Sequence, residues 1–522
     1  MSDQPAELSG PDLATEGALP SAIPDGGMLL GHAGGSPVLL ARRGSEVFAL
    51  EATCSHYGGP LAEGLFDGAC VHCPWHHAAF DVRTGAVVQP PAYKPLTAYA
   101  IDERDGRLFV GAPLEAKPRP APIAAPPSSV VIVGGGAAGN AAAETLRLEG
   151  YAGPVTIVTD DAYLPYDRPN LSKDYLAGTA PEDWIPLRSS EFYKGQRIEL
   201  LLGRRAVRVD SGARRVYLDD GQSLEYDALL LATGAEPVRL DTPGSDLPHV
   251  HYLRTFDDSR AIIAGAAREG VPSAVVVGAS FIGLEVAASL RTRGVETHVV
   301  APEAIPMERV LGPQLGEFVQ ALHVEHGVHF HLERKVTAID ERSVTLDDGT
   351  RIEAGLVVFG VGVSPALDLA EAAAVSIDKG VVVDEYLATS VPGIWAAGDI
   401  ARWPDQHSGQ SIRVEHWVVA QRQGHTAALN MLGRGRRFDA VPFFWSQHYD
   451  VPINYVGHAE HWDRIDVSGD IAGRDCIVAF REAGRTLAVA SIYRDEASLQ
   501  AEQAMERGDE AALQALIPPA SA

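Results

Sequence analysis

Cysteine is scarce in this 522-residue sequence, which contains only four of them. Cys54, Cys70 and Cys73 lie close together, and Cys476 stands far from them among alternating apolar residues, as expected of a buried strand. A set this small and clustered excludes a disulfide framework and favours a metal site. No cysteine lies between positions 74 and 475, which excludes a redox-active disulfide in that part of the chain.

Basic charge and long apolar runs are scarce as well. The chain has 43 Lys and Arg against 69 Asp and Glu, a net charge of −26. This balance disfavours nucleic acid and anionic membranes as partners. No apolar run is long enough to cross a bilayer, and the N-terminal stretch lacks the basic and apolar regions of a signal peptide. We therefore expect a cytoplasmic protein that binds neither nucleic acid nor membrane.

The length of the chain predicts several domains. Residues 1–26 are rich in Pro, Gly, Ala and acidic residues, which predicts a disordered tail. Short β-type runs over 27–111 predict a small all-β domain, and the proline-rich stretch 112–128 predicts a semi-rigid linker. From 129 onward strands alternate with helices, as in a doubly wound α/β protein. The last stretch, 441–522, returns to β-type alternation and ends in helical sequence, which indicates an α+β domain.

Two loops of the all-β part each supply one cysteine and one histidine. Cys54 and His56 are spaced Cys-x-His, and Cys73 and His76 are spaced Cys-x-x-His. A Rieske [2Fe–2S] centre requires this set, because one iron takes two thiolates and the other takes two imidazoles.

Two other kinds of site are open to these residues. Structural zinc usually has paired cysteines followed by paired histidines on a helix, whereas each pair here is mixed and lies among strands. A redox-active Cys70–Cys73 pair would need a helix N-terminus after its first cysteine, and Pro74 and the β context count against one. With the four-ligand set complete, we expect Cys70, His72 and His77 to be bystanders, the histidines solvent-facing or packed.

The stretch "CSHYGGPLAEG…VHCPWHHAAFDVRTGAVVQPPAYKPL" resembles a Rieske ferredoxin domain over nearly all of residues 27–111. The resemblance implies Cys54, His56, Cys73 and His76 as the cluster ligands. His77 stands where many members of that family have glycine.

Two similar units of strand, glycine-rich turn and helix follow, which predicts two dinucleotide sites. In "VVIVGGGAAG", Gly134, Gly136 and Gly139 permit a tight turn, close approach of a pyrophosphate, and strand–helix packing. Asp160 ends the next strand, where a carboxylate can hold a ribose hydroxyl. In the second unit, "VVVGASFIG", a serine replaces the middle glycine, so Gly278 and Gly283 are the firmer positions.

The stretches "YLPYDRPNLSKDYL", "LLLATGAEP" and "VPGIWAAGDIARWP" resemble the FAD-dependent pyridine nucleotide reductases, in particular oxygenase-type ferredoxin reductases and apoptosis-inducing-factor-like proteins. The resemblance implies a multidomain fold in which two α/β dinucleotide-binding domains and an α+β C-terminal domain follow the Rieske domain. The FAD-binding domain would comprise 129–250 and 381–440, and the NAD(P)H-binding domain 251–380. A C-terminal reductase domain would cover 441–522.

The same resemblance implies roles for individual residues. Arg168 and Lys173 would approach the FAD, Ala235 would lie on its second contacting turn, and Asp399 would bind its ribityl–pyrophosphate part. The segment 413–424, with His416 and Trp417, would aim a helix N-terminus at the flavin, where the dipole stabilises the reduced anion.

By the same resemblance, Glu285 would pair with Lys173 near the flavin, and the pair would steer hydride geometry. Ala301 stands where NAD-specific relatives often have an acid, a role that Glu303 could take over. No Arg or Lys in 299–308 could hold a 2′-phosphate, so NADH is favoured over NADPH.

These parts predict an oxidoreductase that splits a hydride from NADH into single electrons on FAD. Its own Rieske cluster would pass them to an acceptor such as an oxygenase, a ferredoxin or a cytochrome. The alternative is an apoptosis-inducing-factor-like, redox-controlled binding protein with slow NADH oxidation. Trp445 is either an aromatic residue near the flavin or an ordinary core tryptophan. A homodimer is among the assemblies that the sequence leaves open.

Overall fold

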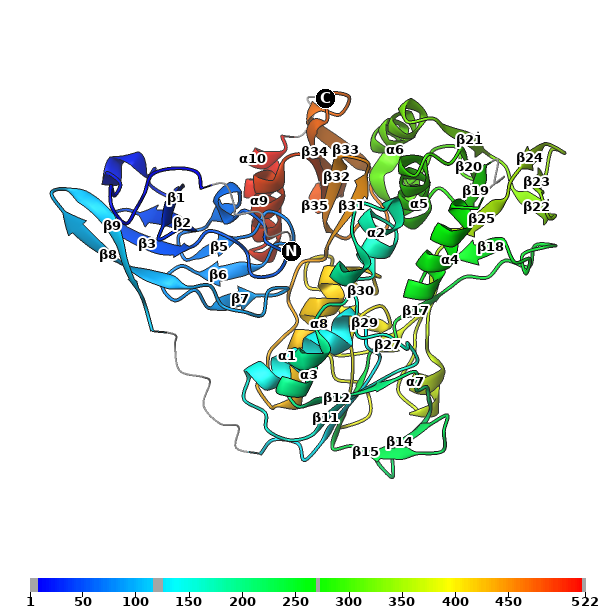
Figure 1. Cartoon of the computed structure of the whole chain (residues 1–522), viewed down its shortest axis with the longest axis horizontal. Helices are drawn as coiled ribbons and strands as arrows, with labels where there is room; N and C mark the ends of the chain where they lie inside the picture. Colours follow the sequence, from blue (N-terminus) through cyan, green and yellow to red (C-terminus); the bar gives the residue numbers. More distant parts are fainter. Residues whose placement is uncertain (1–7, 116–124, 269–272, 519–522) are drawn as a thin grey trace.

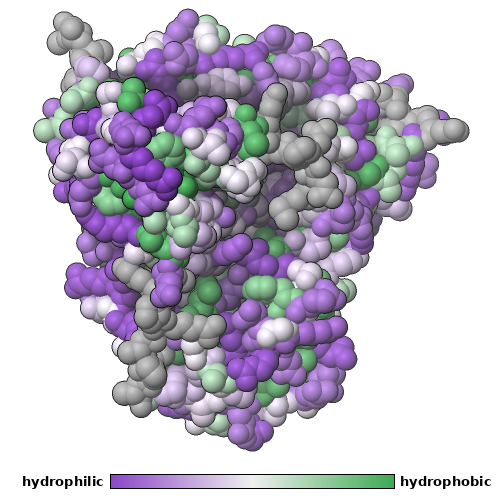
Figure 2. All heavy atoms as spheres, turned by 60° about the vertical axis from the view of Figure 1, so that its left-hand side comes forward, coloured by the Kyte–Doolittle hydropathy of each residue, from purple (hydrophilic) through white to green (hydrophobic). Residues whose placement is uncertain are grey.

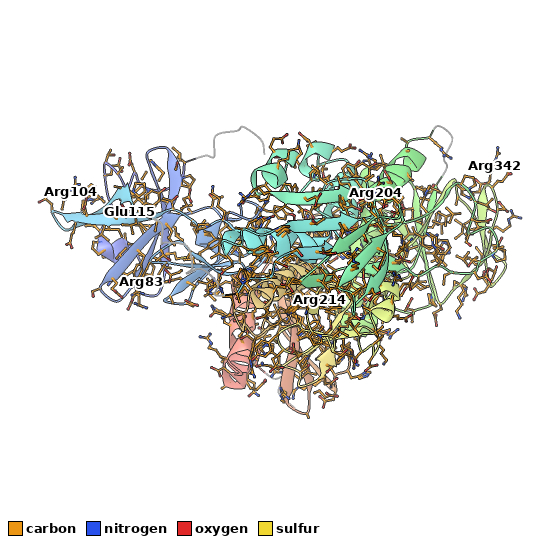
Figure 3. All side chains as sticks on the ribbon, turned by 90° about the horizontal axis from the view of Figure 1, so that it is seen from below. Arg83, Arg104, Glu115, Arg204, Arg214 and Arg342 are labelled. Carbon is orange, nitrogen blue, oxygen red and sulfur yellow. The ribbon has the colours of Figure 1, made fainter. Side chains whose placement is uncertain are left out.

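The computed structural model describes residues 8–115, 125–268 and 273–518. Most of the predicted linker lies outside these ranges. An N-terminal β domain flanks a central body, and a second α/β domain lies on the opposite side (Figure 1). Arg104 and Arg342 mark the two ends of the molecule (Figure 3). The predicted fold class, an all-β domain followed by two α/β domains and a C-terminal sheet domain, is confirmed.

The N-terminal β domain (residues 8–115) contains two antiparallel sheets. The larger has the order β1-β2-β3-β8-β9 and the smaller the order β4-β5-β6-β7. Their bounds are β1 Met28–Ala33, β2 Ser36–Arg43, β3 Glu46–Glu51, β4 Leu65–Phe66, β5 Cys70–His72, β6 Ala79–Asp81, β7 Val87–Gln89, β8 Ala98–Arg104 and β9 Arg107–Pro113, with short 3₁₀ turns η1 Pro20–Ala22 and η2 Leu61–Glu63. Leu39, Leu50 and Phe80 are buried in the core that joins the sheets. The two Cys/His loops are the connections between β3 and β4 and between β5 and β6.

The prediction of a disordered tail over 1–26 is wrong for residues 8–26. Leu13, Ala18 and Ile23 are 0 to 4% exposed and pack in one cluster with core residues of the larger sheet. Asp12 and Ala18 form bridges with His32 and Leu108. A segment poor in apolar residues is therefore ordered, because its few apolar side chains are spaced to reach the sheet. Residues 1–7 lie outside the described ranges.

The first α/β domain has a parallel sheet of order β12-β11-β10-β16-β28, in which the last strand returns from far along the chain. Its elements are β10 Val130–Val133, α1 Ala137–Leu148, β11 Val155–Thr159, η3 Pro169–Leu171, α2 Asp174–Ala177, η4 Glu182–Trp184, α3 Ser190–Gly195, β12 Ile198–Leu202, β16 Ala228–Leu231, β28 Ile394–Ala396 and α8 Trp417–Met431, with a side sheet of β13 Ala206–Asp210, β14 Arg215–Leu218 and β15 Ser223–Glu225. The central strands β10 and β16 are buried at every residue, which explains their unbroken apolar sequence, whereas the edge strand β12 is exposed at Glu199.

The second α/β domain repeats this plan with the order β18-β25-β19-β20-β21. It contains β18 Val250–Tyr252, α4 Phe256–Ala266, β19 Ala274–Val277, α5 Phe281–Thr292, β20 Thr297–Ala301, α6 Glu308–Glu325, β21 Val328–Leu332 and β25 Leu356–Phe359, with a side sheet of β22 Val336–Ile339, β23 Ser343–Leu346 and β24 Arg351–Glu353. The strands β17 Ala235–Pro237 and β26 Val363–Pro365 pair where the chain crosses between the two α/β domains. The remaining short elements are α7 Asp368–Ala372, β27 Val381–Val382, β29 Ala401–Pro404 and β30 Ser411–Ile412.

The two glycine-rich turns have the same backbone form. Gly134 and Gly278 have φ of 114° and 112°, a region that favours glycine. A Cβ on Gly139 would lie 1.9 Å from the carbonyl oxygen of Gly134, and one on Gly283 would lie 2.2 Å from that of Gly278. The internal repeat predicted from the sequence is therefore also a repeat of close strand–helix approach.

The C-terminal domain (residues 441–518) is an antiparallel sheet of order β31-β32-β35-β34-β33, covered by two helices. Its elements are β31 Phe443–His448, β32 Val451–Gly457, β33 Arg464–Asp470, β34 Asp475–Glu482, β35 Arg485–Ile492, α9 Asp495–Glu506 and α10 Glu510–Leu516. Cys476 is fully buried in β34, which confirms its interpretation as a strand residue. Helix α9 lies beside the N-terminal β domain (Figure 1).

Figure 2 shows the molecule turned so that the side with the N-terminal β domain comes forward. This face is mostly hydrophilic, with scattered hydrophobic patches. None of the helices in the described ranges has the length and apolar character needed to cross a membrane.

Candidate functional site

The four predicted metal ligands converge between the two Cys/His loops. Cys54 and Cys73 are 3% and 1% exposed, and a hydrogen bond between their thiols lowers the pKa of Cys54 and raises that of Cys73. The rings of His56 and His76 lie 5.0 Å apart at nearly a right angle. The two thiols therefore face each other, and so do the two imidazoles.

These residues fit a [2Fe–2S] cluster. Burial lowers the pKa of His56 well below its usual value and that of His76 to about 3, so both rings are neutral, as iron ligation requires. Nδ1 of His56 is buried and has no hydrogen-bond partner in the described protein. The two thiols lie together and so do the two imidazoles, which suits two irons that each take two protein ligands.

The three expected bystanders differ in their surroundings. Burial raises the pKa of the Cys70 thiol to about 12, so it is an inert strand residue. His72 and His77 are not solvent-facing: they are 7% and 0% exposed, and both pack against the C-terminal domain. His77 has φ of 59°, the left-handed region that favours glycine. It is held there by an ion pair with Glu502 and by stacking on Phe443.

A buried charge network joins this loop to the rest of the protein. Arg422 of α8 donates to Oε1 of Glu502 at 2.7 Å, to the His77 carbonyl at 3.3 Å and to the Pro90 carbonyl at 3.2 Å. Gln503, the next residue of α9, contacts His72 at 2.9 Å. Side chains of helices α8 and α9 thus bind two loops of the N-terminal β domain.

A second contact lies on the other loop. The Tyr57 hydroxyl, one residue after His56, donates to Oδ2 of Asp167 in the first α/β domain at 2.9 Å. Both metal-binding loops are therefore docked onto the reductase part of the same chain.

A cavity of about 400 Å³ opens where the two α/β domains meet the C-terminal domain. The predicted site residues that line it are Gly134, Gly136, Asp160, Arg168, Lys173, Glu285, Asp399, His416 and Trp417. Those that lie outside its lining are Gly139, Ala235, Gly278, Gly283 and Glu303. The three glycines among them allow close packing of backbone against backbone instead. Ala235 lies in β17, just past the turn residues Thr233 and Gly234 that do line the cavity.

The cavity has features that suit a flavin nucleotide. The glycine-rich turn leaves the backbone bare at Gly136, where a Cβ would have no atom nearer than 4.0 Å. At the other end, α8 begins at Trp417 with His416 as its N-cap, and both line the cavity. The His416 Nδ1 and Trp417 Nε1 atoms are buried and unpartnered within the described protein, so polar atoms of a bound ring are the partners that fit.

The predicted Lys173–Glu285 pair is present. Lys173 Nζ lies 2.8 Å from Glu285 Oε2, and the same carboxylate accepts hydrogen bonds of 2.6 Å from Ser172 and from Ser446. Glu285 is 2% exposed. The charge of Glu285 is compensated by Lys173, which lines the cavity. The two serine hydroxyls fix the position of the Glu285 carboxylate.

Sequence reasoning missed Arg254. Its guanidinium pairs with Asp399 at 2.9 Å, and its carbonyl accepts a hydrogen bond of 2.8 Å from Arg168. This arginine follows a short strand, and no motif in the sequence distinguishes it from the other surface arginines.

Trp445 lies between the metal loops and the cavity. Its ring centroid is 4.4 Å from that of His76, in edge-on contact, and 5.9 Å from Lys173 Nζ. The tryptophan also lines the cavity. A single side chain thus contacts His76, a predicted cluster ligand, on one side and lines the flavin-sized cavity on the other.

Comparison with known families agrees with this division of the chain. The description "Pyridine nucleotide-disulphide oxidoreductase" matches residues 128–424. The chain belongs to that family. "Rieske [2Fe-2S] domain" matches 17–100, and "Reductase C-terminal" matches 443–522. The predicted cofactors, a Rieske [2Fe–2S] cluster, FAD and a pyridine nucleotide, are confirmed, and so is the assignment as a ferredoxin-reductase-type oxidoreductase.

Relatives of this oxidoreductase fall into two groups. Apoptosis-inducing factor 3 of Homo sapiens is 31% identical over 482 residues, covering 88% of this chain and 79% of that protein. Putidaredoxin reductase CamA of Pseudomonas putida is 36% identical over 359 residues, covering 67% of this chain and 85% of that protein. A structure of the covalent putidaredoxin reductase–putidaredoxin complex superposes with a TM-score of 0.70 at 35% identity, covering 73% of this chain and 93% of that one.

The first glycine-rich turn offers a test of the cavity assignment. A valine side chain in Gly139→Val would collide with the Gly134 carbonyl, and we expect this variant to lose about 3 kcal/mol of stability and to purify without flavin. Gly136→Ala meets no protein atom nearer than 4.0 Å, so it should fold normally and bind FAD more weakly. Thermal denaturation and flavin content measure both effects. Full flavin content in Gly136→Ala would place the cofactor elsewhere.

Proposed function

We propose that this chain oxidises NADH on FAD and passes single electrons to its own docked Rieske cluster, which delivers them to an acceptor protein. The observation that carries the proposal is the position of Trp445 between His76 and the flavin-sized cavity. A pyridine nucleotide gives up two electrons at once and a [2Fe–2S] cluster accepts one, so the bound flavin supplies the conversion between them.

The protein's own residues supply binding and positioning. Asp160, Arg168 and Asp399 line the part of the cavity next to the glycine-rich turn, where they would hold the nucleotide portion of FAD. The start of α8 at Trp417 provides a helix N-terminus that favours negative charge on the bound ring. The Lys173–Glu285 pair fixes a cation beside it without leaving an uncompensated buried charge.

The choice of acceptor is drawn from the relatives. Several are named as ferredoxin–NAD(+) reductase components of dioxygenase systems. In the solved complex a putidaredoxin reductase is covalently joined to putidaredoxin. We infer that the fused Rieske domain takes the ferredoxin's place, and that an oxygenase, a ferredoxin or a cytochrome receives the electrons. NADH is the proposed donor, because residues 299–308 contain no Arg or Lys that could hold a 2′-phosphate.

Anaerobic titration with NADH, followed by low-temperature EPR, tests the relay. NADH should bleach the flavin and produce the EPR signal of a reduced Rieske cluster in the same protein, without any added electron carrier. Bleaching without that signal would show that the cluster does not receive the flavin's electrons.

The contact through Trp445 predicts a kinetic effect. In Trp445→Leu the aromatic bridge to His76 is lost, and we expect cluster reduction after mixing with NADH to slow at least about tenfold. Flavin bleaching should keep its rate. Freeze-quench EPR and stopped-flow absorbance separate the two steps, and Trp462→Leu, in the same domain but packed on Phe480, is the control.

A redox-controlled binding protein is the second candidate function. It is favoured by the match to apoptosis-inducing factor 3, which covers 88% of this chain, whereas the match to putidaredoxin reductase covers 67%. Turnover decides between them: rapid NADH-driven reduction of an external ferredoxin or cytochrome supports the reductase. A long-lived complex of reduced protein and NAD⁺ with negligible turnover supports the binding protein.

A further inference from the structure

A chain of hydrogen bonds runs from the Lys173–Glu285 pair through the C-terminal domain. Glu285 Oε1 accepts from the Ser446 hydroxyl at 2.6 Å, and Ser446 Oγ lies 3.2 Å from His448 Nε2. His448 Nδ1 lies 3.1 Å from His323 Nε2, and His323 Nδ1 lies 3.5 Å from the Tyr449 hydroxyl. Each histidine uses both ring nitrogens, one toward the cavity side and one toward Tyr449.

Two arrangements of hydrogens satisfy every link. With Glu285 ionised, all donors point toward it: Tyr449 to His323, His323 to His448, and His448 to Ser446. With Glu285 protonated, every donor points the other way. The two arrangements differ by one proton, and passing between them moves that proton between Glu285 and the outer end while each imidazole changes tautomer.

The middle of this hydrogen-bond series is buried, and its outer end reaches the solvent. Ser446, His448 and His323 are 1%, 0% and 0% exposed. Tyr449 is half-buried in the two-residue turn between β31 and β32, beside the exposed Asp450. The chain therefore connects the cavity to the surface through a region that excludes water.

The surroundings of the two histidines keep them neutral. Burial lowers the pKa of His448 to about 3, with Lys173 adding to the effect, and it lowers the pKa of His323 well below its usual value. The other ring nearest His323 is Phe330 of β21. Next to the outer end, His326 stacks on Tyr449 at 3.6 Å and Arg291 contributes positive charge. A neutral imidazole offers one donor and one acceptor, as proton relay requires.

We propose that this series of hydrogen bonds is the proton conduit of the flavin cavity. It would exchange a proton between Glu285 and solvent through Ser446, His448, His323 and Tyr449. The inference rests on the proposed function. The half-reaction NADH → NAD⁺ + H⁺ + 2 e⁻ leaves one proton in the cavity when the two electrons depart singly to the cluster. Glu285 takes that proton, and the shift between the two hydrogen arrangements delivers one proton to solvent at Tyr449. Rotation of the Ser446 hydroxyl and return of the tautomers reset the chain.

Ser446 is the link that can be removed with least disturbance. Ser446→Ala breaks the chain, Ser446→Thr keeps the hydroxyl, and Ser491→Ala removes a buried hydroxyl of the same sheet that bonds to nothing in the described protein. Protein reduced anaerobically with one equivalent of NADH is mixed with ferricyanide in weak buffer containing a pH-indicator dye. We expect proton release to slow about 100-fold in Ser446→Ala and to stay near the wild-type rate in Ser446→Thr and Ser491→Ala.

The same samples keep the two proposals apart. Flavin bleaching by NADH and the final EPR signal of the cluster, recorded in the wild-type protein and in Ser491→Ala, test the proposed function without disturbing Ser446. Proton release at the wild-type rate in Ser446→Ala would mean that the proton leaves with water through the cavity mouth, and it would overturn the conduit.

A spectroscopic readout tests the chain independently of turnover. In protein labelled with ¹⁵N-histidine, His448 and His323 should show neutral rings with Nε2 protonated at neutral pH in the oxidised state. Ser446→Ala should perturb His448 and leave His298, a histidine of β20, unchanged. An imidazolium, or an Nδ1-protonated tautomer at both positions in the oxidised state, would contradict the proposed arrangement.

Discussion

Replacing Arg422 with methionine is expected to separate the Rieske domain from the reductase part and to slow cluster reduction by at least about tenfold. The Arg422 and Glu502 side chains are 2% and 4% exposed, and they form an ion pair of 2.7 Å. Removing one partner of such a buried pair typically costs about 3 to 5 kcal/mol, because the other charge stays behind without compensation. Arg422→Met also removes the two hydrogen bonds to the His77 and Pro90 carbonyls.

The electrostatics of the pair explain the size of this effect. Burial alone would raise the pKa of Glu502, but Arg422 and His77 outweigh it and hold that pKa at about 2. Without Arg422 the carboxylate keeps its contact with His77. The domain can relieve the remaining buried charge by moving away and admitting water.

Three measurements check the prediction. Small-angle X-ray scattering should show a larger radius of gyration for Arg422→Met, and freeze-quench EPR should show slow cluster reduction with ordinary flavin bleaching. The double variant Arg422→Met with Glu502→Leu removes both charges, and it should recover most of the stability that the single variant loses. An unchanged radius and an unchanged rate in the single variant would show that docking does not depend on this network.

The parts of the site that the sequence revealed are those whose chemistry is local. Cys54 and His56 occupy one loop, and Cys73 and His76 another, so their spacing was enough to predict the ligand set. The glycine-rich turns were visible because backbone geometry demands glycine at Gly134 and Gly278, where φ is strongly positive. In each case the requirement falls on residues within a few positions of one another.

The contacts between domains were not visible, because they join residues hundreds of positions apart. His77 looked like a bystander in its loop, yet Glu502 lies against it from helix α9 of the C-terminal domain. Arg422 lies in the segment 413–424, which the sequence related to the flavin and not to the Cys/His loops. The ordered segment 8–26 was missed for a related reason: its composition indicates disorder, and only the sheet it covers reveals that its few apolar residues are enough.

Helix α8 links the two halves of the proposed mechanism. Its first residue, Trp417, lines the flavin-sized cavity, and Arg422, little more than one turn further on, holds the cluster loops. The helix that holds the Rieske domain in its docked position is thus also the helix whose first residue lines the cavity. Trp445 on the neighbouring strand β31 completes the contact, since Phe443 of the same strand stacks on His77.

Replacing Cys73 with serine is expected to abolish electron delivery to protein acceptors while leaving NADH oxidation by the flavin intact. Serine is a poor ligand for the cluster iron, and loss of a ligand exceeds the 10- to 100-fold cost typical of disturbing the groups that merely support one. We therefore expect iron content near zero and reduction of an external cytochrome or ferredoxin slower by at least about 100-fold. Bleaching of the flavin by NADH should keep its rate, because Cys73 lies outside the cavity lining.

Cys70→Ser is the matched control, since it makes the same substitution three positions away in β5. The Cys70 thiol is half-buried, with its pKa raised to about 12 by burial, and it belongs to neither ligand pair. Iron content, the EPR signal and acceptor reduction should all stay at wild-type levels in that variant. If acceptor reduction instead persisted in Cys73→Ser, the flavin would be reducing the acceptor directly. The Rieske domain would then serve only to dock it, and the Trp445 contact would carry no electrons.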